Sequence, residues 1–580
     1  MKLEPGVKRK IDEWLSGPYD RETKNTLQSM VDAGEHDKLT DAFYRDLEFG
    51  TGGLRGIMGV GTNRINKYTL GAATQGLSNY LKGHFKNKKI RVALAHDNRN
   101  NARKFANIVA DVFSANGIEV FFFDALRPTP ELSFAIRHLN CQSGVMLTAS
   151  HNPREYSGYK AYWSDGGQVI PPHDKNIISE VKAIKDPGAI QFERQKDLVK
   201  VMGAEMDVAF LRKVREAAVF PEVVKKYSDM PIVFSPIHGA SVDMVPAALG
   251  NLGFSNVHLV EEQCTTDGNF PTVVYPNPEE EEAMTLSIKK AKEVGAELAM
   301  ACDPDGDRVG IAVKHPSGKY VLLNGNQTAT LVFHYVMNGW KSQGKLSGNE
   351  YIIKTIVTTF LLDKMAEKMG IKCYNTLTGF KWIGSLMTKL EGKEQFLVGG
   401  EESYGYLIGD HVRDKDAVVS CAIIAEMAAW YRDSGKTLYE ALVDIHGEFG
   451  LYREKLISFT KKGKEGAAEI SAMMESLRKN PPSMLDGEKI TLTRDYLSGM
   501  ERNLLTGEEQ KLDFPQSNVL QFVTEKETVA SARPSGTEPK IKFYISTNRN
   551  LDSSDTYEHH CRELDQKIDR IKDEFIGEKG

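Results

Sequence analysis

The chain has 580 residues, far more than one hydrophobic core usually supports, so we expect about four domains of roughly 150 residues each. Hydrophobic residues make up 41% of it and charged residues 26%, a composition that excludes disordered and fibrous classes. The formal net charge is -5 and the two signs are interleaved along the chain, so the charge favours neither nucleic acid nor an anionic membrane as a partner.

The cysteines and the N-terminal stretch indicate a cellular compartment. The 6 cysteines are scattered without a CxxC pair, which argues against a disulfide framework and a zinc cluster and favours buried free thiols. The opening MKLEPGVKRKIDEWL has charges and a proline where a signal peptide would need an apolar core. Since no apolar run approaches the ~18 residues of a membrane span, we predict a cytoplasmic protein.

Three stretches repeat one order of elements, which is strand, helix, strand, helix and a strand that ends in a polar loop. Strands are expected at 91–97, 118–124 and 144–150, at 231–239, 256–262 and 296–302, and at 350–358, 371–379 and 395–400. The helices between them are expected at 100–117 and 129–140, at 243–254 and 279–295, and at 359–370 and 381–390. Continuous apolar strands that alternate with amphipathic helices predict three α/β domains with parallel strands covered on both faces.

The last part of the chain has a different pattern. A strand at 451–459 precedes a long amphipathic helix at 466–479, and strands at 489–496, 518–525 and 540–547 precede a charged helix from about residue 554. This order is typical of an α+β domain. The predicted domains are 1–205, 206–320, 321–450 and 451–580.

Each α/β repeat places its most polar, glycine-bearing loop at the carboxyl end of a strand, where open α/β sheets bind ligands. One cleft could therefore collect all three loops. The acidic run Glu279 to Glu282 follows a proline at an expected helix start, and we interpret it as interacting with the helix dipole rather than with a metal.

The loop DPDGDR, Asp303 to Arg308, is a candidate metal site. Three aspartates at alternate positions of a tight loop can direct three carboxylates to one point, and Mg²⁺ prefers such oxygen ligands. An EF-hand is excluded, because its sixth position would be Arg308 instead of glycine and its twelfth Lys314 instead of glutamate. A solvated turn with local Asp bonds remains the alternative.

Ser150, in TASHNP, has three possible roles. It could cap the following helix, act with His151 as a hydrolase-like dyad, or carry a phosphoryl group. The dyad is disfavoured, because neighbouring residues of an extended loop point apart and no GxSxG elbow surrounds the serine. A phosphoryl group on Ser150 would supply an oxygen to the metal site.

Two further loops have compositions suited to a phosphosugar. ARPSGTEPKIKF, residues 532–543, combines a guanidinium, two hydroxyls and an ammonium on one turn between prolines, which suits a phosphate dianion, although an ordinary turn is the alternative. GGEESYGY, residues 399–406, could accept hydrogen bonds from sugar hydroxyls, but an exposed acidic turn is equally consistent with it. The glycine-rich stretch FGTGGLRGIMG near the start of the chain lacks the GxGxxG spacing of a dinucleotide-binding loop. Arg55 within this stretch could bind an anion.

These loops together resemble the α-D-phosphohexomutase superfamily, the phosphoglucomutase and phosphomannomutase enzymes. The family's motifs occur in order as TASHNP, DPDGDR, GEESYG and RPSGTEPK, over essentially the whole chain. The resemblance implies a four-domain protein around one central cleft. Three related α/β domains, mixed-sheet and doubly covered, would precede an α+β domain like the TATA-box-binding protein.

The resemblance also implies a role for each matching residue. Ser150 would be the phosphoserine, and it would hold one Mg²⁺ together with Asp303, Asp305 and Asp307. Arg55, His151 and Lys160 would serve the reacting phosphate, with Lys160 as general acid or base. The implied substrate-binding residues are Arg308, Lys381, Glu401, Ser403, Arg533, Ser535, Gly536, Thr537 and Lys540.

From these parts we expect a phosphosugar mutase that interconverts hexose 1-phosphate and hexose 6-phosphate through a hexose 1,6-bisphosphate, which would also act as activator. Positioning and charge neutralisation would supply the catalysis, and the C-terminal domain would move to open and close the cleft. The partner would be a small phosphosugar, with no nucleic acid or membrane, and the chain would be a monomer or weak dimer.

The motifs specify the type of reaction more closely than the identity of the sugar. GEESYG is close to the motif of glucose-selective members, so glucose is the first choice. The long N-terminal segment and TGFKWIG also resemble the phosphopentomutase and glucose-1,6-bisphosphate synthase branch, and phosphomannomutase activity is a further alternative. From other classes, a Mg²⁺-dependent phosphosugar phosphatase and a non-catalytic phosphosugar sensor remain.

Overall fold

The computed structural model of the protein describes residues 3–50, 52–461, 463–535 and 540–576. The chain forms two compact units. The first comprises Met1–Leu323, Phe380–Phe396 and Ser403–Ser434, and the second comprises Asn324–Gly379, Leu397–Glu402 and Gly435–Gly580.

Three helices open the first unit: α1 (Pro5–Ser16), α2 (Arg21–Asp32) and α3 (His36–Phe43). A proline lies at the start of α1, and the side chain of Asp20 caps α2 by accepting the Thr23 N–H. The apolar faces of the three helices share a small core that includes Trp14, Leu27 and Phe43.

The first sheet has the order β1-β5-β4-β2-β3-β6. Its strands are β1 (Gly53–Ile57), β2 (Arg91–His96), β3 (Glu119–Phe123), β4 (Ser143–Leu147), β5 (Tyr156–Trp163) and β6 (Val199–Met202). The parallel strands β4, β2, β3 and β6 are extended by β5, which runs antiparallel to β4 and to β1.

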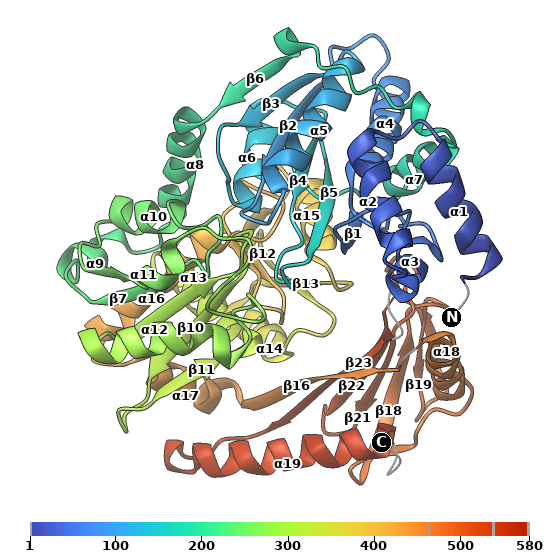
Figure 1. The fold of residues 1–580 in the computed structure, drawn as a ribbon. Coiled ribbons are helices and arrows are strands. Elements are labelled where there is room, and N and C mark those ends of the chain that lie inside the picture. The colour runs from blue at the N-terminus through green and yellow to red at the C-terminus, as the bar shows by residue number, and fades with distance from the viewer. Residues whose placement is uncertain (1–2, 51, 462, 536–539, 577–580) are drawn as a thin grey trace. The chain divides into compact units, whose positions relative to one another are not determined.

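Helices cover both faces of this sheet (Figure 1). They are α4 (Lys67–His84), α5 (Ala102–Ala115), α6 (Thr129–His138) and α7 (His173–Ala183). Apolar side chains of α4, α5 and α7 form one core with Val145 and Leu147 of β4. Gly144 points to the opposite face, where Ile136 of α6 lies so close that a Cβ on Gly144 would meet it at 2.3 Å.

The second sheet has the order β11-β10-β9-β7-β8, in which β10 runs antiparallel to both of its neighbours. Its strands are β7 (Ile232–Ser235), β8 (Val257–Leu259), β9 (Leu298–Cys302), β10 (Val309–Lys314) and β11 (Tyr320–Leu323). One face is covered by α12 (Glu281–Val294), and α10 (Met244–Leu252) packs with α16 (Ala417–Asp433). The unit also contains α8 (Ala204–Glu216), α9 (Pro221–Lys226), α11 (Glu261–Cys264), α15 (Phe380–Leu390) and β15 (Tyr406–Ile408).

The second unit contains two further sheets. One has the strand order β13-β12-β14, from β12 (Glu350–Thr355), β13 (Lys372–Thr376) and β14 (Gln395–Gly400). The helices around it are α13 (Gly325–Ser342), α14 (Leu361–Met369) and α17 (Leu438–Phe449). The other sheet is antiparallel, with the order β16-β23-β22-β21-β18-β19-β20.

This C-terminal sheet is covered by two helices, α18 (Gly463–Lys479) and α19 (Tyr557–Ile576), which pack into one core with it. Its strands are β16 (Leu451–Thr460), β18 (Glu488–Asp495), β19 (Met500–Asn503), β20 (Glu509–Lys511), β21 (Leu520–Thr524), β22 (Val529–Pro534) and β23 (Lys540–Arg549), and β17 (Met484–Leu485) pairs with β18. Three α/β segments followed by this α+β domain confirm the predicted fold class.

The first two sheets are mixed, as the family resemblance implied, because β5 and β10 return antiparallel directly after the loops that hold Ser150 and Asp303. The repeat pattern alone predicted only parallel strands. The repeat pattern did not contain β1 or β5, which carry Arg55 and Lys160. The boundaries of the four predicted domains stay a prediction.

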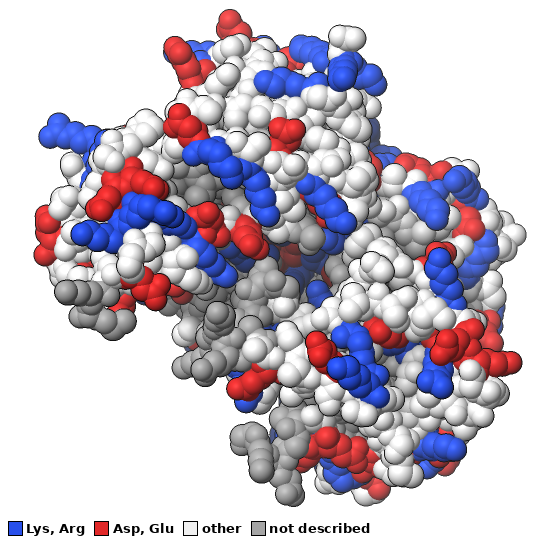
Figure 2. Space-filling model, turned by 90° about the vertical axis from the view of Figure 1, so that its right-hand side faces the viewer, with Lys and Arg blue, Asp and Glu red and all other residues white. Residues whose placement is uncertain are grey.

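The surface and the cysteines agree with the composition. On the face shown in Figure 2, basic and acidic side chains are interleaved. Within the described part of the chain, no helix combines the length and apolarity that a membrane span requires. All six cysteines are free, as predicted, although Cys264 and Cys373 are only half-buried.

Candidate active site

Ser150 lies in the loop after β4, and Arg99 determines the shape of this loop. Ser150 has a φ of 52°, a left-handed conformation that costs a non-glycine residue roughly 1–3 kcal/mol. Thr148 Oγ1 accepts its N–H at 2.8 Å. The buried guanidinium of Arg99 donates to the carbonyl oxygens of Ser150 at 2.5 Å, Pro153 at 2.8 Å and Tyr156 at 3.0 Å. The strained serine is therefore held by hydrogen bonds at several points of its loop.

The three aspartates of DPDGDR converge as predicted. One carboxylate oxygen from each lies within 4.8 Å of the other two, and all three residues are buried. Asp303 Oδ1 accepts the N–H groups of Asp307 and Arg308, which closes the loop after β9. Asp305 Oδ1 and Asp307 Oδ1 are buried and accept no hydrogen bond from the described residues. Buried carboxylate oxygens without donors fit a hard divalent cation.

Ser150 contacts this triplet directly. Its hydroxyl donates to Asp303 Oδ2 at 2.8 Å, across 153 positions of sequence. The serine and the metal loop, which come from different sheets, thus form one site.

Two lysines neutralise part of the triplet. Lys160 donates to Asp305 Oδ2 at 2.6 Å and to Asp307 Oδ2 at 3.2 Å. Lys415 lies 3.2 Å from the same Asp307 oxygen. Burial alone would lower the pKa of Lys160, but Asp305 and Asp307 outweigh it and leave that pKa raised. Lys160 is therefore an ammonium ion at neutral pH.

The position of His151 contradicts the expectation that the side chains of Ser150 and His151 point apart. Its Nδ1 lies 3.1 Å from Ser150 Oγ, so these neighbours do not point apart. The left-handed φ of Ser150 removes the extended geometry on which the expectation rested. Burial, followed by the cations Arg308 and Arg55, holds the pKa of His151 well below its usual value. The imidazole is therefore neutral at neutral pH.

The two arginines of the predicted site lie in the first unit. Arg55 projects from β1 and donates to Asn152 Oδ1 at 3.1 Å, beside the serine loop. Arg308 ends the metal loop and forms an ion pair with Glu279 at 2.8 Å. Glu279 lies ahead of α12, so helix-dipole interaction explains only the later members of the acidic run.

The predicted sugar contacts have varied surroundings. Glu401, at the end of β14, is buried and accepts the Gly379 N–H at 2.8 Å. Its neighbour Glu402 accepts the hydroxyls of Thr355 and Thr358 and so supports β12.

Lys381 and Ser403 belong to the first unit, where Ser403 is half-buried. Lys381, at the second position of α15, lines a cavity of about 220 Å³ with Trp163 and Gln168.

The predicted phosphate loop connects β22 to β23. Arg533 pairs with Lys542 across this hairpin, and the Lys540 carbonyl accepts the Ser535 N–H at 2.7 Å. The buried phenol of Tyr544 has a raised pKa, first because of burial and then because of Glu402, while Arg533 opposes the shift. Arg533 and the glutamates after β14 therefore lie near one tyrosine. Gly536 and Thr537 lie outside the described residues.

The sequence analysis missed several residues at the site. Arg99, Lys415 and Thr129, whose Oγ1 donates to Asp305 Oδ2 at 2.8 Å, were not among its candidates. Lys415 lies in the charged run DHVRDKD, directly before a helix that Asp416 caps. A dense run of charges flanked by apolar segments was a usable signal. Arg99 and Thr129 had none, because single polar residues after strands are common.

Comparison with known proteins agrees with this architecture. Family models described as phosphoglucomutase/phosphomannomutase, alpha/beta/alpha domains I, II and III match residues 46–187, 209–318 and 324–447. Phosphoglucomutase of Staphylococcus haemolyticus (strain JCSC1435) is 34% identical over 547 residues, which is 93% of this chain and 95% of that one. Phosphoglucomutase of Staphylococcus aureus (strain MRSA252) is 34% identical and covers 92% and 94% of the two chains.

Two solved structures share the fold. The open form of pp63/parafusin, a phosphoglucomutase from Paramecium, has a TM-score of 0.67, with 21% identity and coverage of 92% of this chain and 96% of that one. A phosphoglucomutase/phosphomannomutase family protein from Burkholderia thailandensis has a TM-score of 0.64, with 17% identity and coverage of 92% and 98%.

The fold and the sequence matches define an enzyme of the mutase class, an isomerase of carbohydrate metabolism. The chain belongs to the phosphoglucomutase/phosphomannomutase family of phosphosugar mutases.

Arg99→Lys tests whether Arg99 positions the serine loop. A lysine ammonium cannot reach the several carbonyls that the guanidinium fork holds, so we expect kcat to fall by about 100-fold while KM changes less than about threefold. Steady-state kinetics with glucose 1-phosphate measure both. Arg91→Lys, at the other end of β2, is the matched control and should leave kcat unchanged. An equal loss of kcat in both variants would contradict the positioning role.

Proposed function

We propose that the protein interconverts glucose 1-phosphate and glucose 6-phosphate through a phosphoserine at Ser150 and a glucose 1,6-bisphosphate intermediate. The contact of Ser150 Oγ with Asp303 Oδ2, at 2.8 Å, is the observation that carries this proposal. A serine ester there would lie beside three buried carboxylates and two lysines. The glucose preference rests on the GEESYG motif and on the relatives named phosphoglucomutase.

The residues around Ser150 would handle the phosphoryl group and its protons. In the forward step the phosphoserine gives its phosphoryl group to the free hydroxyl of the sugar phosphate, and the Ser150 oxygen regains a proton. Lys160, held charged by Asp305 and Asp307, is our candidate donor of this proton, and the proton that the attacking sugar hydroxyl releases would restore its charge. In the return step, which is the reverse reaction at the same oxygen, Lys160 would take the serine proton back, and the neutral His151, 3.1 Å from Oγ, would help to hold the hydroxyl in place. Arg55 would add a positive charge.

The aspartate triplet would hold one Mg²⁺. Asp303, Asp305 and Asp307 fit it because two of their buried oxygens lack donors, and an oxygen of the modified Ser150 would join them. When bound, Mg²⁺ would neutralise charge on the phosphoryl oxygens. The charges of Lys160 and Lys415 reduce the repulsion among these carboxylates.

The other predicted residues would bind the remainder of the substrate. We propose that Arg533, Ser535, Gly536, Thr537 and Lys540 hold the phosphate that does not react, with Arg308 and Lys381 as further phosphate or sugar contacts. Glu401 and Ser403 would accept hydrogen bonds from sugar hydroxyls. Because the bisphosphate must reverse its ends, the same groups must accept either end of the sugar.

A Mg²⁺-dependent phosphosugar phosphatase is the second candidate, and the contact between Ser150 and His151 is the observation in its favour. The same neutral histidine could activate water on the phosphoserine. A mutase must exclude that water, whereas a phosphatase requires it.

Turnover assays distinguish these functions and rank the sugars. Supplied with Mg²⁺ and a trace of glucose 1,6-bisphosphate, the enzyme should convert glucose 1-phosphate to glucose 6-phosphate with release of inorganic phosphate below about 1% of turnover. The kcat/KM for glucose monophosphate should exceed the values for mannose, glucosamine and ribose monophosphates. Stoichiometric phosphate release without a bisphosphate requirement would contradict the mutase and support the phosphatase.

A further inference from the structure

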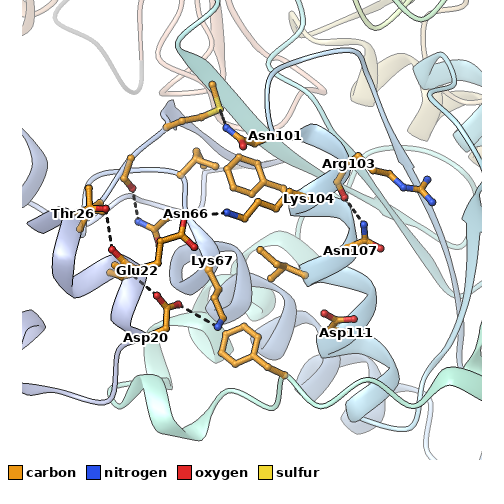
Figure 3. A pocket seen from close by; sticks show the side chains of 18 residues that line it. Asp20, Glu22, Thr26, Asn66, Lys67, Asn101, Arg103, Lys104, Asn107 and Asp111 are labelled. Carbon is orange, nitrogen blue, oxygen red and sulfur yellow. Dashed lines mark hydrogen bonds and ion pairs between the residues drawn. The ribbon is translucent and has the colours of Figure 1, made fainter.

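A second cavity, of about 980 Å³, lies in the first unit between α2, the start of α4 and the start of α5 (Figure 3). This volume is in the range of small-molecule sites, about 300–1,000 Å³. One wall is α2, which precedes the residues matched by the domain I family model. The cavity therefore depends on a helix that lies outside the residues matched by that model.

The cavity has apolar and aromatic walls. Phe105 and Ile65 are buried residues of its lining, and Ile108 and Phe192 are further lining residues. The ammonium of Lys67 lies 5.0 Å from the centre of the Phe192 ring. A flat apolar group could pack here beside a cation.

The acidic side chains of the cavity already have donors. Asp20 accepts the Thr23 N–H at 2.9 Å and the Tyr68 hydroxyl at 3.1 Å, and it pairs with Lys67. Asp111 is paired with Arg194, which lies outside the lining. These carboxylates are therefore poor sites for a cationic ligand.

Among the cations that line the cavity, Lys104 can most easily leave its ion pair and bind a ligand. Its contact with Glu22 across the cavity is 3.6 Å long, and the two side chains are 61% and 83% exposed. An exposed pair of this kind contributes about 0–1 kcal/mol, so an anion can replace Glu22 at little cost. Figure 3 shows Lys104 extending from α5 toward α2, and Asn66 and Asn101 add amide groups nearby.

We propose that this cavity binds a small organic anion that carries an aromatic ring, with the anionic group on Lys104 and Lys67 and the ring against Phe192 and Phe105. The site is separate from Ser150 but adjoins the segments that support it. Met58 of its lining follows β1, which carries Arg55, and Asn101 follows Arg99 by two residues.

Phenyl phosphate is a suitable probe, because it combines a ring with a phosphate. Calorimetric titration of the full-length protein should show a component of binding that Lys104→Glu weakens at least tenfold. Thr26→Trp, an exposed position of α2 in the lining, should remove the same component by filling the cavity without changing charge. Inorganic phosphate, which lacks the ring, should not reproduce it.

Lys8→Glu is the matched control, because Lys8 is an exposed lysine of α1 outside the lining. It makes the same charge change and should leave the titration unchanged. Titrations of Lys104→Glu and Thr26→Trp that match the unaltered protein would overturn the proposal, since all binding would then lie elsewhere, including at Ser150. Equal weakening by Lys8→Glu and Lys104→Glu would also overturn it, by showing a general charge effect.

Discussion

Replacing Ser150 with alanine is expected to reduce mutase turnover by at least about 1,000-fold, because the proposed chemistry has no other group to carry the phosphoryl between the two ends of the sugar. Binding of the sugar phosphate should persist, since the cations around the site remain. The unaltered protein, purified after incubation with glucose 1,6-bisphosphate, should gain ~80 Da in intact mass. Ser150→Ala should show no such gain.

Ser157→Ala is the matched control for this variant. Ser157 is buried in β5, close in sequence to the site, and its Oγ has no hydrogen-bond partner among the described residues. Its removal should leave turnover within about twofold. Full turnover in Ser150→Ala, or an 80 Da gain that survives the substitution, would exclude the phosphoserine mechanism.

Asp303→Asn should reduce turnover by at least about 100-fold and weaken Mg²⁺ binding, because it removes one of three clustered carboxylates. Without metal, the same substitution should raise the Tm. Burial, and then the charges of Asp305 and Asp307, place the pKa of Asp303 well above its ordinary value. An acid with a raised folded-state pKa destabilises the fold when it is ionised at neutral pH, so removing its charge stabilises the metal-free protein.

Thermal unfolding with and without Mg²⁺ measures these opposite effects. Mg²⁺ should raise the Tm of the unaltered protein and change that of Asp303→Asn much less. Asp243→Asn is the control, since this exposed residue before α10 makes no side-chain cap. It should change neither the Tm nor its response to metal. A metal-free Asp303→Asn protein less stable than the unaltered one would show that the carboxylate stabilises the empty site.

The sequence predicted the elements of the three α/β repeats and their helices well. Apolar runs such as residues 91–97 and 118–124 are strands because a buried central strand must be apolar on both faces. The antiparallel strands β5 and β10 were not among the predicted elements, since they follow the functional loops directly and lie outside the repeated order of elements. The aromatic-rich YSGYKAYW of β5 was a strand signal that the repeat pattern obscured.

By itself the sequence determined the chemistry available to this protein: a serine beside a histidine, three alternating aspartates and a turn with arginine, hydroxyl and lysine side chains, each after a strand. Only the tertiary structure decided which of these groups meet. Arg99, Lys415 and Thr129 join Ser150 and the aspartates from distant positions, and Ser150 turns toward His151 through a left-handed φ. The physical reason is that motif chemistry is local, whereas proximity and charge compensation arise from packing between segments far apart in sequence.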